Sequence, residues 1–150
     1  MKWKQFAADQ GFRALNVVHR NVVRVSGGRV GRSAFGMPVV TLHSVGRRSG
    51  LDRTTLLTVP VTDGHRYVLV ASKGGDDRDP EWFLNVQAHP EIELTVDGRR
   101  RALRARVASS VESDELWPQI IHAYRPYDSY RRRTSRDIPL VICEARADRE

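Results

Sequence analysis

The chain has 150 residues, with 25 Lys or Arg against 18 Asp or Glu and a formal net charge of +7. This length fits one domain over residues 1–150, and 40% hydrophobic with 29% charged residues is typical of a globular protein. The single cysteine, Cys143, excludes an intramolecular disulfide and a cysteine-based zinc site. No apolar run reaches the roughly 20 residues that span a bilayer, and none resembles a signal peptide, so we expect a cytoplasmic protein.

Residues 1–33 carry most of the net charge, because Asp9 is their only acidic residue. Apolar residues at helical spacing predict an amphipathic helix over 12–25, which Ser26-Gly27-Gly28 ends. Three interpretations stay open for this helix: it lies on an anionic membrane, it covers a cofactor site, or it is an ordinary surface helix with a solvated basic face. Residues 34–150 are expected to form the core of the domain.

The middle and the end of the chain are rich in predicted strands. Alternating or β-branched runs cover residues 38–45, 54–62, 67–71, 92–96, 102–108 and 138–143. Asp63-Gly64 and Asp97-Gly98 are hairpin signals between such runs. After the second turn the alternation places Arg104 and Arg106 on the face opposite the apolar residues. We interpret this arginine face as solvated, and we expect no nucleic-acid partner because aromatic residues do not interleave with the arginines.

Two helices are expected among these strands. Asp79 as cap and Pro80 at the first helical position begin one, which ends at His89-Pro90. The second is expected to begin with Ser113 as its cap and to run through Tyr124. Antiparallel hairpins with inserted helices predict an α+β, mainly β domain built as a small barrel or sheet.

The first candidate functional segment is the turn Gly46-Arg47-Arg48-Ser49-Gly50, which Arg53 follows three residues later. Two glycines permit a tight turn whose backbone N–H groups converge on an anion. Arginine binds phosphate or carboxylate through paired hydrogen bonds, and every cationic residue of the chain except three lysines is Arg. We interpret the turn as a candidate anion site, and the alternative is a solvated hairpin.

The second segment is Ala71-Ser72-Lys73-Gly74-Gly75, directly after a predicted strand. Its glycines let the backbone approach a ligand, while Ser72 offers a hydroxyl and Lys73 a charge, although an ordinary loop has the same composition. On the helix that follows, Trp82 is a core or cofactor-facing residue, and Asn85 requires a hydrogen-bond partner if it is buried.

Tyr124, Tyr127 and Tyr130 recur every three residues, which places them near one face of a helix or helical turn. One interpretation is aromatic packing. The other is an aromatic wall with phenolic donors for a flat, partly polar substrate.

Taken together, these segments resemble the deazaflavin-dependent nitroreductase family of actinobacteria. The matching residues are Gly46-Arg47-Arg48-Ser49-Gly50, Arg53, Ala71-Ser72-Lys73-Gly74-Gly75, Pro80-Glu81-Trp82-Phe83-Leu84-Asn85, His89-Pro90, Trp117-Pro118, Tyr124, Tyr127, Tyr130 and Ile138-Pro139. The resemblance implies a split β-barrel related to flavin-binding proteins of the pyridoxamine-phosphate-oxidase type. It also implies coenzyme F420, whose phosphodiester and oligoglutamate tail would supply the anion.

By this resemblance, most of the singled-out residues bind F420. The implied cofactor-binding residues are Arg47, Arg48, Ser49, Arg53, Ala71, Ser72, Lys73, Gly74, Gly75, Trp82 and Asn85, and the implied catalytic residues are Ser72, Tyr124, Tyr127 and Tyr130. No metal is implied.

The implied activity is transfer of a hydride from reduced F420 to a small-molecule acceptor, namely a quinone, an activated enone or a nitroaromatic compound. We hypothesise that a menaquinone-type lipid quinone is one acceptor, with the basic N-terminal helix in peripheral contact with an anionic membrane. The alternatives are a non-catalytic F420 carrier, a split barrel that binds FMN or haem and, least favoured, a basic nucleic-acid-binding module.

Overall fold

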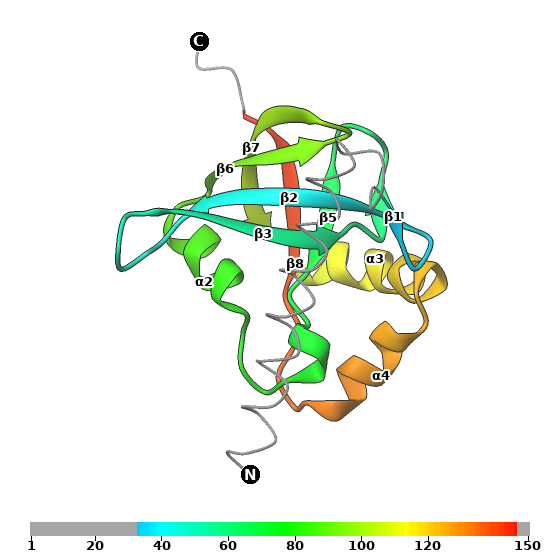
Figure 1. Cartoon of the computed structure of the whole chain (residues 1–150). Coiled ribbons are helices and arrows are strands. Elements are labelled where there is room, and N and C mark those ends of the chain that lie inside the picture. Colours follow the sequence, from blue (N-terminus) through cyan, green and yellow to red (C-terminus); the bar gives the residue numbers. More distant parts are fainter. Residues whose placement is uncertain (1–32, 147–150) are drawn as a thin grey trace.

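The computed structural model describes residues 33–146, and Figure 1 shows a curled sheet with helices packed against it. The helix expected over 12–25 lies outside the described residues. The strands are β1 (Ser33–Ala34), β2 (Met37–Val45), β3 (Asp52–Thr58), β4 (Val61–Thr62), β5 (Tyr67–Val70), β6 (Glu91–Val96), β7 (Arg99–Val107) and β8 (Leu140–Ala145). The helices are the 3-10 turn η1 (Lys73–Gly75), α2 (Glu81–Ala88), α3 (Ser110–Ala123) and α4 (Pro126–Arg133).

Every strand pairing in the sheet is antiparallel, as expected from the hairpin signals. The strand order is β1-β2-β6-β7-β8-β5-β4, and β3 pairs with the other edge of β2. Asp97 and Gly98 both have positive φ, 50° and 78°, which the tight β6–β7 hairpin requires. Leu103 is buried while Arg104 and Arg106 are exposed, so the predicted alternation of β7 is confirmed.

The apolar core has two parts, one on each face of the central strands. Alternate residues of β5 and β8 divide between these parts: Leu69 and Val141 belong to the cluster that packs against α2, whereas Val70 and Ile142 belong to the cluster under α3 and α4. Because both faces are covered, these two strands are apolar at almost every position. The buried thiol of Cys143 lies in β8, and burial raises its pKa to about 12, so it is an inert packing residue.

The predicted strand over 54–62 is wrong as one element, because β3 ends at Thr58 and β4 begins at Val61. Pro60 has no N–H to donate to a ladder, and Val59 instead donates its N–H to the Pro38 carbonyl. The last strand likewise begins at Leu140, after Pro139, and not at residue 138.

Both predicted helix caps are also wrong. Pro80 is the residue that caps α2, and the carboxylate of Asp79 instead accepts from Arg136 at 3.0 Å. The cap of α3 is Ser109, four residues before Ser113, and it forms a capping box with Glu112. Pro118 therefore lies well inside α3, on its exposed side.

Ion pairs and hydrogen bonds connect the first turn of α3 to the sheet. Arg106 of β7 donates two hydrogen bonds to Glu112, at 2.8 and 2.9 Å, and one to Glu144 of β8 at 2.7 Å. The Arg106 hydrogen bonds, together with that from the Ser109 N–H, lower the pKa of Glu112 from 4.5 to about 2.

We expect E112Q to lower the melting temperature at pH 7 by about 3 °C, the effect of losing about 1 kcal/mol of the ion pair with Arg106, because glutamine can still complete the capping box. Because the pKa of Glu112 is lower in the folded state, its stabilisation is fully present above pH 4.5 and is lost as the pH falls towards 2. The melting temperatures of E112Q and wild type should therefore converge near pH 2. Thermal melts against pH check this, with E115Q, an exposed residue of the same helix, as the control. A difference that persists near pH 2 would contradict the role of the Glu112 carboxylate.

Candidate active site

Three segments that are distant in sequence form the candidate site. They are the turn between β2 and β3, the segment of residues 71–76 around η1 (the η1 segment), and the aromatic residues at the end of α3 and in α4. Residues of α4 contact η1, and Arg47 of the turn bonds to α2, the helix that follows η1 in the chain.

The β2–β3 turn has the tight geometry that its glycines predict. The Gly46 N–H donates to the Leu51 carbonyl at 2.8 Å, and the Gly50 N–H donates to the Gly46 carbonyl at 2.9 Å. A Cβ at Gly46 would lie 2.6 Å from the Ser49 hydroxyl, so the Ser49 side chain would have to turn away to admit one. Arg48 and Ser49 are exposed at the tip of the turn.

The other two arginines of this segment differ in their surroundings. Arg53 is exposed at the start of β3, and its guanidinium donates to Ser49 at 3.4 Å. Arg47 points towards α2, where its guanidinium donates to Glu81 at 2.7 Å and to Asn85 at 3.0 Å. The hydrogen bond from Arg47 lowers the pKa of Glu81. Arg47 therefore joins the turn to α2, while Arg48 and Arg53 face solvent.

Asn85 is buried, and the hydrogen-bond partner that it therefore requires is Arg47 of this turn. The Asn85 side-chain oxygen accepts from the backbone N–H of Arg47 at 3.1 Å as well as from its guanidinium. Trp82, on the same helix, is buried in the core with its ring edge-on to Phe83. Asn85 thus fixes the turn, and Trp82 fixes α2 against the sheet.

The segment after β5 has an unusual backbone. Lys73, Gly74 and Gly75 have positive φ values of 46°, 63° and 84°. A side chain at Gly75 would lie 3.0 Å from the Tyr130 carbonyl, so only glycine permits the close approach of η1 to α4. Ala71 and Ser72, directly before this turn, are buried.

The tyrosines form a row of rings, as their spacing on a helix or helical turn predicted, but they come from the junction of two helices. Tyr124 ends α3, whereas Tyr127 and Tyr130 lie in α4. The ring centroids of Tyr124 and Tyr127 are 5.3 Å apart and those of Tyr127 and Tyr130 are 5.8 Å apart, with edge-on geometry in both pairs. Phe35 extends the row, because its ring lies 5.2 Å from that of Tyr124.

The hydroxyl groups of Tyr127 and Tyr130 have different environments. Tyr127 is 6% exposed, and its hydroxyl forms a hydrogen bond of 3.1 Å with Thr58 of β3. Burial raises the pKa of both Tyr127 and Tyr130, so both phenols stay protonated at neutral pH. Tyr130 is only half-buried, so its hydroxyl is more accessible than that of Tyr127.

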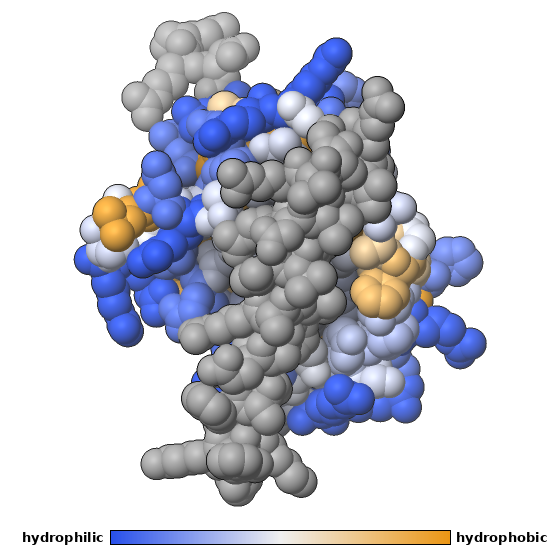
Figure 2. All heavy atoms as spheres, in the orientation of Figure 1, coloured by the Kyte–Doolittle hydropathy of each residue, from blue (hydrophilic) through white to orange (hydrophobic). Residues whose placement is uncertain are grey.

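Two exposed apolar residues flank the site. Figure 2 shows a mostly hydrophilic face with orange atoms over the β2–β3 turn and over the β1–β2 hairpin, where Leu51 and Phe35 are exposed. Phe35 is 67% exposed although it packs on Tyr124.

Sequence reasoning missed three residues of the candidate site. Phe35 extends the aromatic row, Thr58 bonds to the Tyr127 hydroxyl, and Arg136 bonds to the backbone on both sides of η1. The dipeptide Phe35-Gly36 carries a weak turn signal, but nothing in the sequence indicates that its ring reaches Tyr124.

The described part of the chain contains no group of three or more His, Cys, Asp or Glu side chains placed to hold a metal ion. Between residues 33 and 146, no helix is long and apolar enough to cross a membrane.

Comparison with known proteins identifies the family. The family model for F420H(2)-dependent quinone reductases matches residues 16–145. This chain belongs to that family. The F420H(2)-dependent quinone reductase Rv1261c of Mycobacterium tuberculosis is 37% identical over 134 residues, which cover 86% of this chain and 89% of the relative.

Solved structures agree with this assignment. A structure of an F420-H2 dependent reductase, FDR-A, superposes with a TM-score of 0.65 and 34% identity, covering 71% of this chain and 94% of that one. A Clostridium acetobutylicum protein of the pyridoxinephosphate oxidase family has a TM-score of 0.50 at 12% identity, covering 82% of this chain and 83% of its own, and shows the fold alone. The split β-barrel that the sequence resemblance implied is therefore confirmed.

Proposed function

We propose that this chain is an oxidoreductase that transfers a hydride from reduced coenzyme F420 to a quinone. The observation that carries the proposal is its membership of the F420H(2)-dependent quinone reductase family over residues 16–145. The geometry supports it, because an arginine-bearing turn, a glycine-rich segment and a row of aromatic rings are held in one fold.

The β2–β3 turn is the proposed site for the acidic part of the cofactor. Arg48 and Arg53 are exposed there, so their guanidinium groups are available for a phosphodiester or for glutamate carboxylates. Arg47 contributes less directly, since its guanidinium is already bonded to Glu81 and Asn85. Lys73, in the η1 segment, adds a further positive charge towards the same ligand.

The deazaflavin ring, when bound, supplies a hydride, and the task of the protein is to orient the acceptor and to exclude water. Negative charge develops on the acceptor oxygen as it receives the hydride, and a hydrogen-bond donor at that oxygen stabilises it. We assign this donor role to the Tyr130 hydroxyl or to Ser72, which lie on the two segments that meet at Gly75. Tyr124 presents the wall against which the acceptor stacks, and the buried ring of Tyr127 supports it from behind with edge-on contact.

The wall also bears on the class of acceptor. Phe35 and the tyrosines present aromatic surface that suits a flat conjugated ring. A quinone fits this description, and activated enones and nitroaromatic compounds are further proposed acceptors. Among quinones we propose a lipid quinone of the menaquinone type.

The first experiment is a titration of the purified protein with oxidised F420, followed by tryptophan fluorescence, with FMN in parallel. Saturable binding of F420 alone is the expected result, and it is then followed by turnover of reduced F420 with menadione, cyclohexenone and a nitroimidazole. Binding without turnover of any acceptor would favour a non-catalytic carrier. Binding of FMN or a haem absorption band would favour the other type of split barrel.

Substitutions of Tyr130 and Tyr127 should have different effects, the first on kcat and the second on stability. We expect Y130F to lower kcat with menadione by about a hundredfold, the effect of losing one donor to a developing oxyanion. Y127F should instead cost about 1 kcal/mol of stability, because it leaves the Thr58 hydroxyl without its 3.1 Å partner. Steady-state kinetics and thermal melts distinguish the two effects. An unchanged kcat in Y130F would move the donor role to Ser72.

We further propose that the protein is cytoplasmic and contacts an anionic membrane through residues 1–33. The support is the basic, amphipathic character of this segment in the sequence. Deleting residues 1–25 should abolish sedimentation with vesicles that contain anionic lipid, and sedimentation equal to that of the full chain would contradict the contact.

A further inference from the structure

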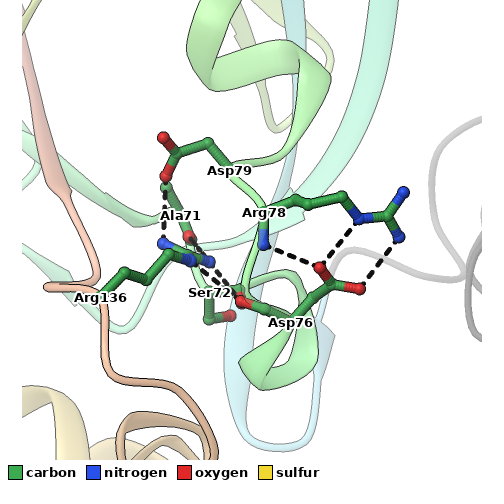
Figure 3. A network of polar contacts seen from close by, with 6 residues as sticks. All are labelled: Ala71, Ser72, Asp76, Arg78, Asp79 and Arg136. Atoms are coloured by element: carbon green, nitrogen blue, oxygen red, sulfur yellow. Dashed lines mark hydrogen bonds and ion pairs between the residues drawn. The ribbon is translucent and has the colours of Figure 1, made fainter. Parts of the chain in front are cut away.

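Arg136, between α4 and β8, lies at the centre of a network that surrounds the η1 segment (Figure 3). Its side chain is 15% exposed. Its Nη2 donates to the carbonyls of Ala71 and Ser72, at 3.1 Å each, and its Nε donates to the Asp76 carbonyl at 2.9 Å. Its Nη1 donates to the Asp79 carboxylate at 3.0 Å. All three nitrogens of the guanidinium group are therefore bonded.

The three carbonyls that Arg136 binds lie on both sides of η1. The Gly75 N–H donates to the Ser72 carbonyl at 2.9 Å, and the N–H of Asp76, directly after η1, donates to the Lys73 carbonyl at 3.2 Å. The positive φ of Lys73 is unfavourable for a residue with a side chain, and such a conformation persists only where the surroundings enforce it. Arg136 bonds to the backbone on both sides of this residue, at Ala71 and Ser72 before it and at Asp76 after it.

Further contacts connect this network to the rest of the candidate site. Arg133, in the last turn of α4, donates to the Gly74 carbonyl at 3.4 Å. Asp76 is held from its other side, because Arg78 donates to both of its carboxylate oxygens at 3.0 Å. Asp79 precedes α2, the helix whose Asn85 holds the arginine turn. Arg136 thus joins the segment that carries Ser72 to the residue before α2, and Arg133 and Asn85 continue the contacts to α4 and to the β2–β3 turn.

We propose that Arg136 is a positioning residue for the cofactor, which acts by fixing the backbone around Ser72 and Lys73. This inference rests on the proposed function, because it assigns these two residues to F420. The planar fork of arginine is required, since it reaches carbonyls on both sides of η1 and the Asp79 carboxylate at once. Lysine keeps the charge and the ion pair with Asp79, but a single nitrogen cannot replace the fork.

The test compares R136K with R132K in the full chain. Arg132 is on α4, its side chain is 75% exposed, and it pairs with Asp128, so it is a matched control outside the network. We expect R136K to raise the dissociation constant for oxidised F420 and the KM for reduced F420 about tenfold, with kcat at saturating cofactor reduced less than threefold. Amide hydrogen exchange at Gly75 and Asp76, measured without cofactor, should accelerate about tenfold. R132K should change none of these values.

A second variant keeps the inference testable if R136K does not fold. D79N removes the charge of the carboxylate partner of Arg136 but leaves the carbonyl bonds, so we expect about a threefold weaker binding of F420, with the exposed Asp77 changed to Asn as control. Wild-type F420 affinity in folded R136K, or in D79N if R136K is unfolded, would overturn the role of Arg136. If the wild-type chain binds no F420, the proposed function fails instead, and hydrogen exchange then decides the loop-fixing role alone.

Discussion

The double variant R48Q/R53Q is expected to bind oxidised F420 at least about a hundredfold more weakly than the wild-type chain. A hydrogen bond to a charged group contributes about 1.5–3 kcal/mol, and the two substitutions remove the guanidinium groups that face solvent at the β2–β3 turn. Arg47 is left in place, because its bonds to Glu81 and Asn85 hold the turn on α2. The loss should therefore fall on ligand binding and not on folding.

Fluorescence titration measures this loss, and R99Q/R101Q is the matched control. Arg99 and Arg101 are exposed on β7, so this variant removes the same net charge from outside the candidate site. We expect it to bind F420 within a factor of three of wild type. Wild-type binding should also weaken with added salt more steeply than binding by R48Q/R53Q. Equal losses in the two double variants would contradict a specific anion site at the turn.

The second large effect is expected at Gly75. G75A should lower stability by about 3 kcal/mol or more and reduce turnover by more than tenfold, because backbone strain and a steric clash both act at this residue. The φ of 84° is unfavourable for alanine, and the new methyl group would press on the Tyr130 carbonyl and on Arg133 at 3.0 Å. The backbone of α4 must then move away from η1, and Tyr130 moves with it.

G64A separates these two costs. Gly64 has a similar φ of 88° but has no atom within 4 Å of an added methyl group, so G64A should show only the conformational cost, about 1–2 kcal/mol. Thermal melts and steady-state kinetics of both variants provide the comparison. If G75A and G64A lose the same stability and keep the same turnover, the close approach of η1 to α4 does not matter for the activity.

Local sequence patterns were sufficient for much of the fold. The hairpin at Asp97-Gly98 was predictable because its backbone conformation favours those residue types, and the alternation in β7 places Leu103 in the core. Prolines produced the errors in strand limits, since Pro60 separates β3 from β4 and Pro139 precedes the start of β8. The start of α3 was misplaced because Ser109 and Ser113 are both suitable caps, and only the Glu112 carboxylate and its Arg106 partner favour the first.

The candidate site was predictable in composition but not in arrangement. The residue types of the turn and of the η1 segment indicate an anion site and a close backbone approach, and the structure shows tight turns at both places. The different roles of the arginines were not predictable. Arg47 contacts Glu81 and Asn85 of α2, which are separated from it by 34 and 38 positions in the sequence. The same holds for the tyrosines, of which Tyr127 is buried against Thr58.

The sequence by itself therefore determined the antiparallel architecture, the family and the segments that carry the chemistry, since these depend on local spacing and residue type. Only the tertiary structure decided which side chains within those segments are free to meet a ligand and which hold the fold. Phe35 reaches Tyr124 and Arg136 reaches Ala71 across long stretches of chain. Such contacts depend on how the sheet curls and how the helices pack on it, and no local pattern encodes that geometry.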